Sequence, residues 1–265
     1  MNLTGKEHTF VICAYKESPY LEACILSLKK QAVKSSIIMV TSTDSPFLHT
    51  MAEKYRIPLF INEGEGGITQ DWNFGLSKVK TPLATIAHQD DFYCRSYTKK
   101  VLEKVNASKH PLLVFTDYGE IRGKRWVKNS RLLKIKRMML IPLEHSAFAG
   151  SRLVRRGILA FGNPISCPTV TYYRPNLPTP VFSDGFLCSE DWEAWEKISR
   201  KKGDFLYCRE ILVYHRIHED STTSMVIGKT GRSEEDYQMF LKFWPSPIAK
   251  ILTTLYASSE KSNEL

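Results

Sequence analysis

The chain has 265 residues, of which 43% are hydrophobic, and it carries a formal net charge of +9. This apolar content supports a substantial core and excludes a disordered chain. No apolar run reaches the ~18–20 residues that a membrane helix needs, and the first residues lack the order of a signal peptide, so we expect a cytoplasmic protein. The six cysteines form no CxxC pair, and we expect reduced thiols with no metal or redox role.

The excess of positive charge predicts an anionic partner. It is concentrated in residues 122–137, which contain eight basic residues and no acidic one. Nucleic acid, an anionic lipid surface and a phosphorylated substrate all fit this density of charge. The basic residues are Arg122, Lys124, Arg125, Lys128, Arg131, Lys134, Lys136 and Arg137.

Strands and helices alternate in the first half of the chain. Apolar, β-rich runs predict strands at residues 9–15, 37–41, 59–61 and 83–87. Amphipathic segments predict a helix that Ser18 caps and Pro19 begins, a helix at 46–55, and a helix through Trp72 after a glycine-rich turn. This alternation predicts parallel βαβ units in a doubly wound α/β sheet.

The second half of the chain is less regular. Its pattern predicts strands at residues 112–116, 167–173, 205–208 and 211–217, and helices at 147–159 and 190–201. A C-terminal helix at 234–256 is expected to break at Pro245 and Pro247. No repeat or low-complexity linker divides the chain, which favours a single domain.

The most informative segment is the pair Asp90-Asp91 at the end of a predicted strand, because ligands of open parallel sheets bind beyond the strand ends. Adjacent carboxylates repel each other unless a counter-charge is present, and a divalent cation supplies one. Neighbouring side chains of an extended chain point in opposite directions, so one aspartate can bind a metal while the other bonds a ribose hydroxyl. A solvated turn explains the pair equally well. Other candidates follow the first and second strands: Ala14, Tyr15, Glu17, Thr43 and Asp44.

Two later segments also carry candidate residues. Glu190 and Asp191 begin a predicted helix after Ser189. They are either a general base with its neighbour or simply acidic residues at a helix start, where negative charge is favourable. On a strand, Arg216 and His218 share one face, and a cation beside an imidazole suits a pyrophosphate and its metal. Because successive side chains of a strand point to opposite faces, His215 would face away from Arg216 and His218, as a core histidine does.

In this order and at this spacing, the segments resemble the family 2 glycosyltransferases, which have the GT-A fold. The likeness covers about residues 9–223. The matching residues are Ala14-Tyr15 at the nucleotide-proximal opening, Asn73, Gly75 and Leu76 of the N-x-G-L helix, His88 to Asp91 at the DXD position, Glu190-Asp191 at the ED motif, and Arg216, His218, Ser221 and Thr223 of the late R-x-H-x-x-S-x-T segment.

The resemblance implies a Rossmann-like, mostly parallel sheet with helices on both faces. Residues 1–225 would form the GT-A domain, with a nucleotide-sugar half at 1–117 and an acceptor half at 118–225, and residues 226–265 a C-terminal helical extension. It also implies inverting transfer from a nucleotide-diphosphate sugar, with a UDP-sugar favoured, to a hydroxyl of a glycan or lipid-linked glycan in surface polysaccharide assembly.

The resemblance likewise implies roles for individual residues. Asp191 would be the base with Glu190 as its neighbour, and Asp91 and His218 would bind Mg²⁺ or Mn²⁺. The nucleotide-sugar contacts would come from Ala14, Tyr15, Glu17, Asp44, Asp71, Asn73, His88, Asp90 and Arg216.

The sequence departs from the family pattern in three places. Residues 41–44 replace the usual Asp-Asp-Gly-Ser run, Trp72 stands where an arginine is common, and His88 replaces the first aspartate of DXD. A sugar nucleotidyltransferase is an alternative, although residues 13–18 lack the glycine of a phosphate loop. A non-catalytic nucleotide- or carbohydrate-binding relative is another. A nucleic-acid partner would leave both acidic pairs unexplained, and we expect none.

The basic segment at residues 122–137 allows two interpretations. It is either a solvated surface above a core-facing helix or a peripheral docking site at the inner face of an anionic cell membrane. Apolar residues near the C-terminus could add to such a face: Phe240, Phe243, Trp244, Ile248, Ile251, Leu252 and Leu255.

Overall fold

The computed structural model describes residues 1–218 and 231–261. In this part of the chain a nine-stranded sheet runs in the order β3-β2-β1-β4-β8-β6-β9-β5, with β7 paired to β6. The strands are β1 (His8–Cys13), β2 (Ser36–Thr41), β3 (Leu59–Ile61), β4 (Leu83–His88), β5 (Phe92–Tyr93), β6 (Pro111–Arg122), β7 (Arg125–Val127), β8 (Val170–Tyr173) and β9 (Asp204–Ile217).

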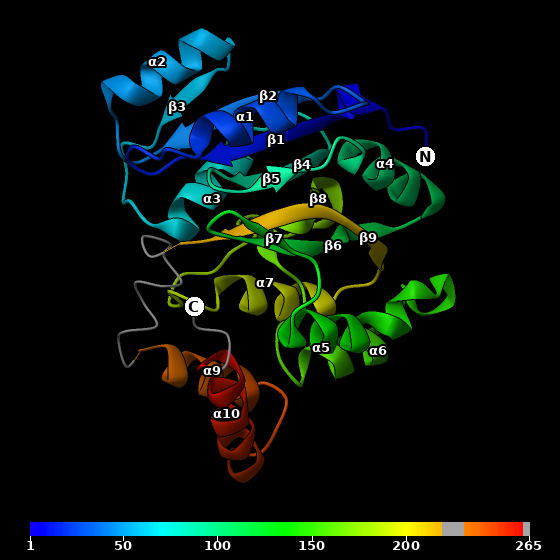
Figure 1. Ribbon diagram of the computed structural model, residues 1–265. Helices are drawn as coiled ribbons and strands as arrows, with labels where there is room; N and C mark the ends of the chain where they lie inside the picture. The colour runs from blue at the N-terminus through cyan, green and yellow to red at the C-terminus, as the bar shows by residue number, and fades with distance from the viewer. Residues whose placement is uncertain (219–230, 262–265) are drawn as a thin grey trace.

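Helices cover both faces of this sheet, as predicted (Figure 1). One core layer packs α1, α2 and α4 on one face, and a second layer packs α3, α6 and α7 on the other. Helix α5 contributes to both layers, with Leu133 in the first and Leu140 in the second. The helices are α1 (Leu21–Lys29), α2 (Pro46–Tyr55), α3 (Ile68–Lys78), α4 (Tyr97–Ala107), α5 (Arg131–Leu140), α6 (Arg152–Leu159), α7 (Glu190–Ser199), α9 (Gly231–Leu241) and α10 (Ser246–Lys261).

The first four strands along the sheet confirm the predicted parallel units. Strand β2 pairs in parallel with β3 and β1, and β1 pairs in parallel with β4. The direction changes at β8, which is antiparallel to both β4 and β6. Strands β6 and β9 are again parallel, and the short β5 runs antiparallel to β9. The carboxyl ends of β1, β2, β3 and β4 therefore meet at one edge.

Several predicted boundaries were wrong. The two strands expected at 205–208 and 211–217 are the single strand β9, and residues 167–169 form a 3₁₀ turn before β8. Helix α6 begins only at Arg152, because Ser151 caps it. Helix α4 was not predicted, and neither were the short strands β5 and β7.

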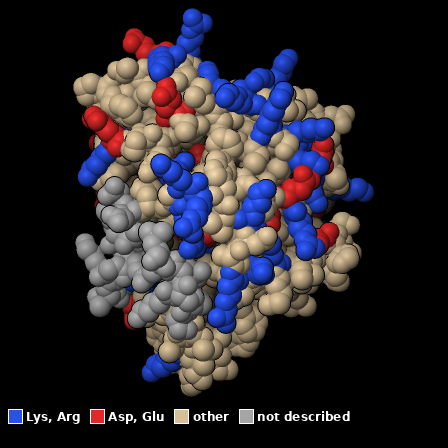
Figure 2. Space-filling model, viewed as in Figure 1, with Lys and Arg blue, Asp and Glu red and all other residues tan. Residues whose placement is uncertain are grey.

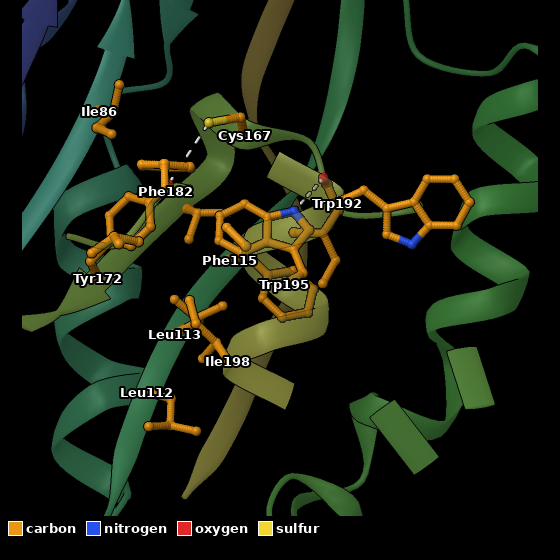
Figure 3. Close-up of a cluster of buried hydrophobic side chains, with 14 of the residues drawn as sticks. Ile86, Leu112, Leu113, Phe115, Cys167, Tyr172, Phe182, Trp192, Trp195 and Ile198 are labelled. Atoms are coloured by element: carbon orange, nitrogen blue, oxygen red, sulfur yellow. Dashed lines mark hydrogen bonds between the residues drawn. The ribbon is translucent and has the colours of Figure 1, made fainter. Parts of the chain in front are cut away.

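Two tryptophans fix α7 in the core. Trp192 and Trp195 are at most 1% exposed. In Figure 3, Trp195 lies among the sheet side chains Leu113 and Phe115, whereas Trp192 points away from them. Each buried indole contributes on the order of 4 kcal/mol of apolar burial, so the position of α7 relative to the sheet is strongly determined.

A buried arginine holds the C-terminal end of α7. Arg155 on α6 is 1% exposed, and its Nε donates to the Ser199 carbonyl at 2.8 Å. Its other two nitrogens donate to the carbonyls of Lys201 and Gly203. Burial lowers the pKa of Arg155 to about 10, so it stays charged at neutral pH. A cation is favourable at this end of a helix, where carbonyl groups lack partners.

The C-terminal helices α9 and α10 pack against Trp192 of α7. The break near Pro245 is confirmed, since α9 ends at Leu241 and α10 begins at Ser246. Phe240 and Tyr256 contact the Trp192 ring, with centroids 5.1 and 5.6 Å away. Among the described helices, none has the length and hydrophobicity needed to cross a bilayer.

Candidate active site

A tight turn after β4 carries the two adjacent aspartates. Strand β4 ends at His88, and β5 begins at Phe92 and pairs with Tyr214 of β9. This pairing brings the turn with Asp90 and Asp91 against the last residues of β9. Residues that are more than 120 positions apart in sequence therefore share one edge of the sheet.

Asp91 lies inside this turn with a fully buried side chain. Its Oδ1 accepts hydrogen bonds from the Arg216 backbone N–H and from His215 Nδ1, both at 2.9 Å. Its Oδ2 has no hydrogen-bond partner among residues 1–218 and 231–261. Although burial opposes the charges, each partner stabilises the other: His215 lowers the pKa of Asp91, and Asp91 raises the pKa of His215. The sequence analysis treated His215 as a core histidine that faces away from Arg216 and His218, whereas the structure places it against Asp91.

Asp90 lies at the surface side of the same turn. Its Oδ1 accepts from Ser18 Oγ at 2.7 Å, and its Oδ2 accepts from His218 Nε2 at 3.1 Å. About a fifth of each side chain of this pair is exposed, 21% for Asp90 and 18% for His218. The structure thus brings His218 to Asp90, whereas the sequence analysis paired it with Asp91. Ser18 does not cap α1, which begins at Leu21 with no side-chain cap.

Arg216 lies beside this pair with its guanidinium over the Tyr20 ring, 4.2 Å from the centroid. Its Nε donates to the Asp90 carbonyl at 3.0 Å. The Tyr20 ring also contacts His218, with centroids 5.2 Å apart. Tyr20 was missed by the sequence analysis because it stands alone before α1. Ser221 and Thr223 of the late motif lie outside the described residues.

His88 completes a second group of potential ligands. Its ring stacks on Trp72 at 5.4 Å, and its Nδ1 lies 4.0 Å from Asp91 Oδ2. His88, Asp91 and His215 offer ligand atoms that all lie within 4.8 Å of one another, close enough for one metal ion. Burial lowers the pKa of His88 and favours the neutral imidazole that a metal requires.

Three predicted nucleotide contacts lie at the same edge. Ala14 is buried after β1, and the backbone of Tyr15 is bonded through both its N–H and its carbonyl to the side-chain amide of Gln89. The Tyr15 ring is half exposed. Asp71 is buried on α3, where its two oxygens accept from Ser42 and Asn62 after β2 and β3. These hydrogen bonds connect the segments that follow β1, β2, β3 and β4 at this edge of the sheet.

Three other predicted contacts have different surroundings. Asp44 is exposed and pairs with His49 at 2.7 Å, and Glu17 is exposed. The side-chain amide of Asn73 is bonded twice to the backbone of Phe182, at 2.9 and 3.1 Å. Asn73 therefore holds the loop after residue 181 against α3.

The predicted base lies at the start of α7. Asp191 is half-buried, its Oδ1 accepts from the Trp192 backbone N–H at 2.7 Å, and the Asn163 side chain also bonds to it. Burial raises the pKa of Asp191, and the positive charge of Lys136 opposes this rise. Glu190 is 5% exposed, and burial raises its pKa to about 8.

Aromatic contacts connect the strand ends to α7. Trp72, which stacks on His88, also contacts Phe182 with centroids 4.8 Å apart. Phe182 in turn contacts Trp195 on α7 at 6.4 Å. Phe182 and Trp195 lie together in one cluster of buried side chains (Figure 3), which thus links Trp72 to α7.

Residues 9–161 match the model of glycosyl transferase family 2. The chain belongs to this family. Membership confirms the predicted resemblance and makes the protein a glycosyltransferase. Residues 162–265, which include the segment with Glu190 and Asp191, lie outside the matched range.

The structure of this family 2 glycosyltransferase is similar to crystal structures of S. aureus TarS. Residues 1–349 of TarS in complex with UDP-GlcNAc share 15% identity, with a TM-score of 0.62 over 93% of this chain and 70% of that chain. The same segment in complex with UDP gives 15% and 0.62 over 89% and 70%. A second TarS structure gives 13% and 0.59 over 92% of this chain and 42% of that chain. This likeness confirms the GT-A fold. No curated protein matches the sequence.

Proposed function

We propose that the protein transfers a sugar, with inversion, from a UDP-sugar to a hydroxyl of a glycan or lipid-linked glycan. One observation carries the proposal: Asp90, Arg216 and His218 meet beside the ends of the parallel strands, where ligands of such sheets bind, and α7 presents Asp191 in its first turn. The UDP-GlcNAc and UDP complexes of S. aureus TarS support this class of donor. Family membership favours glycosyl transfer over the nucleotidyltransferase and non-catalytic alternatives.

The departing diphosphate gains negative charge and needs positive charge nearby. Arg216 supplies a permanent cation, and its stacking on Tyr20 holds the guanidinium in place. Asp90 and His218 are in contact and partly exposed, so their carboxylate and imidazole fit a divalent cation that a diphosphate also contacts. Bound there, Mg²⁺ or Mn²⁺ would neutralise part of the negative charge on the departing diphosphate.

Asp91 is the less accessible of the two aspartates. Its Oδ1 already accepts two hydrogen bonds that fasten β9 to the turn. Its other oxygen, with His88 and His215, forms the alternative metal group. Two imidazoles beside one carboxylate favour Mn²⁺ or another transition metal over Mg²⁺. Metal titrations of the His218→Ala and His215→Ala variants distinguish the two placements.

The acceptor hydroxyl must lose a proton as it attacks the sugar. We assign this proton to Asp191, which is half-buried and therefore reachable from solvent. Glu190, with a pKa of about 8, is mostly protonated at neutral pH and suits a hydrogen-bond donor better than a base. A single displacement of this kind inverts the sugar carbon and needs no nucleophile from the protein.

Nucleotide release from a panel of UDP-, GDP- and dTDP-sugars tests the function directly. We expect the full chain to release UDP from one donor in a manner that requires a divalent cation. Binding of UDP, measured by calorimetry, should survive in Asp191→Asn while release falls. Absence of UDP binding together with absence of release from every donor contradicts the proposal.

The surface of the basic segment supports peripheral contact with an anionic membrane, where a lipid-linked acceptor would lie. Three of its eight cations point inward, since Arg122 pairs with Glu120, Arg137 pairs with Asp117, and Lys136 donates to the Tyr118 hydroxyl. Five remain exposed: Lys124, Arg125, Lys128, Arg131 and Lys134. Lys and Arg side chains outnumber acidic ones on this face (Figure 2).

Exposed apolar side chains lie at the end of α5 and on α10. Met138 and Ile141 are 62% and 46% exposed at the end of α5, and Ile251 and Leu255 are 62% and 60% exposed on α10. Phe240, which the sequence analysis included in this face, is buried against Trp192. Such a combination suits the interface of an anionic bilayer.

Flotation with vesicles of anionic or neutral phospholipid tests this contact. We expect binding to anionic vesicles only, and loss of binding in a variant with Arg131→Glu and Lys134→Glu. A variant with Lys30→Glu and Lys80→Glu, two exposed cations outside the segment, is the matched control. Equal flotation of both variants contradicts the proposal.

A further inference from the structure

A carboxylate from α9 closes the N-terminal end of α7. Glu235 Oε1 accepts a hydrogen bond from the Leu187 backbone N–H at 2.7 Å. Its Oε2 accepts from the backbone N–H groups of Cys188 and Ser189 at 2.9 and 3.0 Å. Three consecutive N–H groups, directly before Glu190, thus bind one side chain that is 46 to 48 residues away in sequence.

These contacts have a clear electrostatic basis. The start of a helix carries the positive end of its dipole, and successive N–H groups there form an anion-binding concavity. A side chain at the helix start usually supplies the acceptor, but Ser189 makes no such capping bond. Glu235 does not replace this cap, because the three N–H groups that it binds precede the first turn of α7. It instead fixes the backbone that leads into the helix, through bonds to a charged acceptor that are about twice as strong as neutral ones.

The surroundings of Glu235 fix it in this position. The neighbouring Asp236 is 2% exposed and lies 3.5 Å from Ser189 Oγ. Near the end of α9, Phe240 packs on Trp192, and just after the helix Lys242 donates to Glu193 of α7 at 3.2 Å. Individual side-chain contacts from α9 and the residue after it therefore attach this segment to α7.

We propose that Glu235 is a positioning residue for sugar transfer, whose carboxylate fixes the backbone of residues 187–189 and thereby the location of Asp191. The inference rests on the proposed function, in which Asp191 is the base. It assigns a role in the reaction to the C-terminal extension, which the matched family range of residues 9–161 does not include.

The charge of Glu235 also reaches Glu190. Burial raises the pKa of Glu190 most, and the negative charges of Asp191 and Glu235 add to this rise, while Arg232 opposes it. Loss of the Glu235 charge therefore lowers the pKa of Glu190. Because Glu190 acts as a protonated hydrogen-bond donor in the proposed function, the alkaline limb of the pH profile of turnover should follow this pKa.

The test compares Glu235→Gln with Glu234→Gln in the full chain. Glutamine keeps the size of the side chain and one acceptor oxygen but removes the charge. Glu234 is the matched control, because it is exposed on the same helix and contacts only Gln238 among the described residues. We expect Glu235→Gln to lower kcat by about 10- to 100-fold, as expected for a displaced catalytic group, with the KM for the donor unchanged. The pH profile of kcat should shift to lower pH.

Glu235→Asp extends the test if Glu235→Gln folds poorly by circular dichroism. Aspartate keeps the charge but shortens the reach, so we expect a reduced kcat with the pH profile of the unsubstituted chain. Unchanged kcat and an unchanged pH profile in folded Glu235→Gln would overturn the inference. If Asp191→Asn is also fully active, the proposed function fails; if Asp191→Asn is inactive, only the role of Glu235 fails.

Discussion

Glu190 should make the protein less stable as the pH rises, and Glu190→Gln should remove this effect. In the folded chain its pKa is about 8, because burial penalises the charged form, against an ordinary value of 4.5. Between these two values the folded state binds more protons than the unfolded state, so the free energy of unfolding falls with increasing pH. Below pH 4.5 both states are protonated and the penalty is absent.

The size of the penalty follows from the two pKa values. A difference of one pKa unit corresponds to about 1.4 kcal/mol, so the full penalty above pH 8 is about 5 kcal/mol. Between pH 5 and pH 8 the penalty grows by about 3.5 kcal/mol. Glutamine has no charge to desolvate, so Glu190→Gln should gain about this much stability relative to the unsubstituted chain over the same interval.

Urea denaturation at pH 5, 6, 7 and 8 measures this difference. At each pH, the free energy of unfolding of the variant is compared with that of the unsubstituted chain. Contributions from groups whose titration the substitution does not change are equal in the two chains and cancel in this difference. Glu234→Gln on the surface of α9 serves as the control and should show no trend. A stability difference between Glu190→Gln and the unsubstituted chain that stays constant from pH 5 to pH 8 would refute the reasoning.

Three further predictions concern α7 and the diphosphate end of the site. Arg155→Met leaves three carbonyls without donors and should lower the free energy of unfolding by about 3–5 kcal/mol in urea denaturation; a loss below 1 kcal/mol would contradict the role of the guanidinium. Asp191→Asn should lower kcat for nucleotide release by ~10²-fold or more, because a positioned base accelerates a reaction by at least this factor, and donor affinity should be retained. Near-normal turnover rejects the assignment. His218→Ala should raise the Mn²⁺ concentration needed for half-maximal release, whereas His49→Ala, an exposed histidine beside Asp44, should leave it unchanged.

The parallel half of the fold could be predicted because its strands are short, continuous apolar runs. The spacing of Tyr97, Val101 and Val105 also indicates a helix, and α4 could have been found from it. Strand β5 could not, because two residues have no periodicity. Its pairing with β9 is what brings His215 to Asp91, so the contact between these two residues could not be predicted without this strand.

The site was predictable where a local motif marks it, and hidden where it depends on distant contacts. The acidic pairs at 90–91 and 190–191 were found from the sequence, but the partner of His218 was set by the path of β9. Glu235 stands in a run of three acidic residues on a helix, Glu234 to Asp236, and nothing in the sequence distinguishes it from its neighbours. The inward cations of the basic segment were equally hidden, because their acceptors lie on β6.

The two ends of α7 are attached to different helices by groups of opposite charge. Arg155 on α6 binds the carbonyls at the C-terminal end of α7, and Glu235 on α9 binds the backbone N–H groups just before its first turn. A change that displaces α9 would therefore free only the end that bears Asp191, while the other end stays docked on α6.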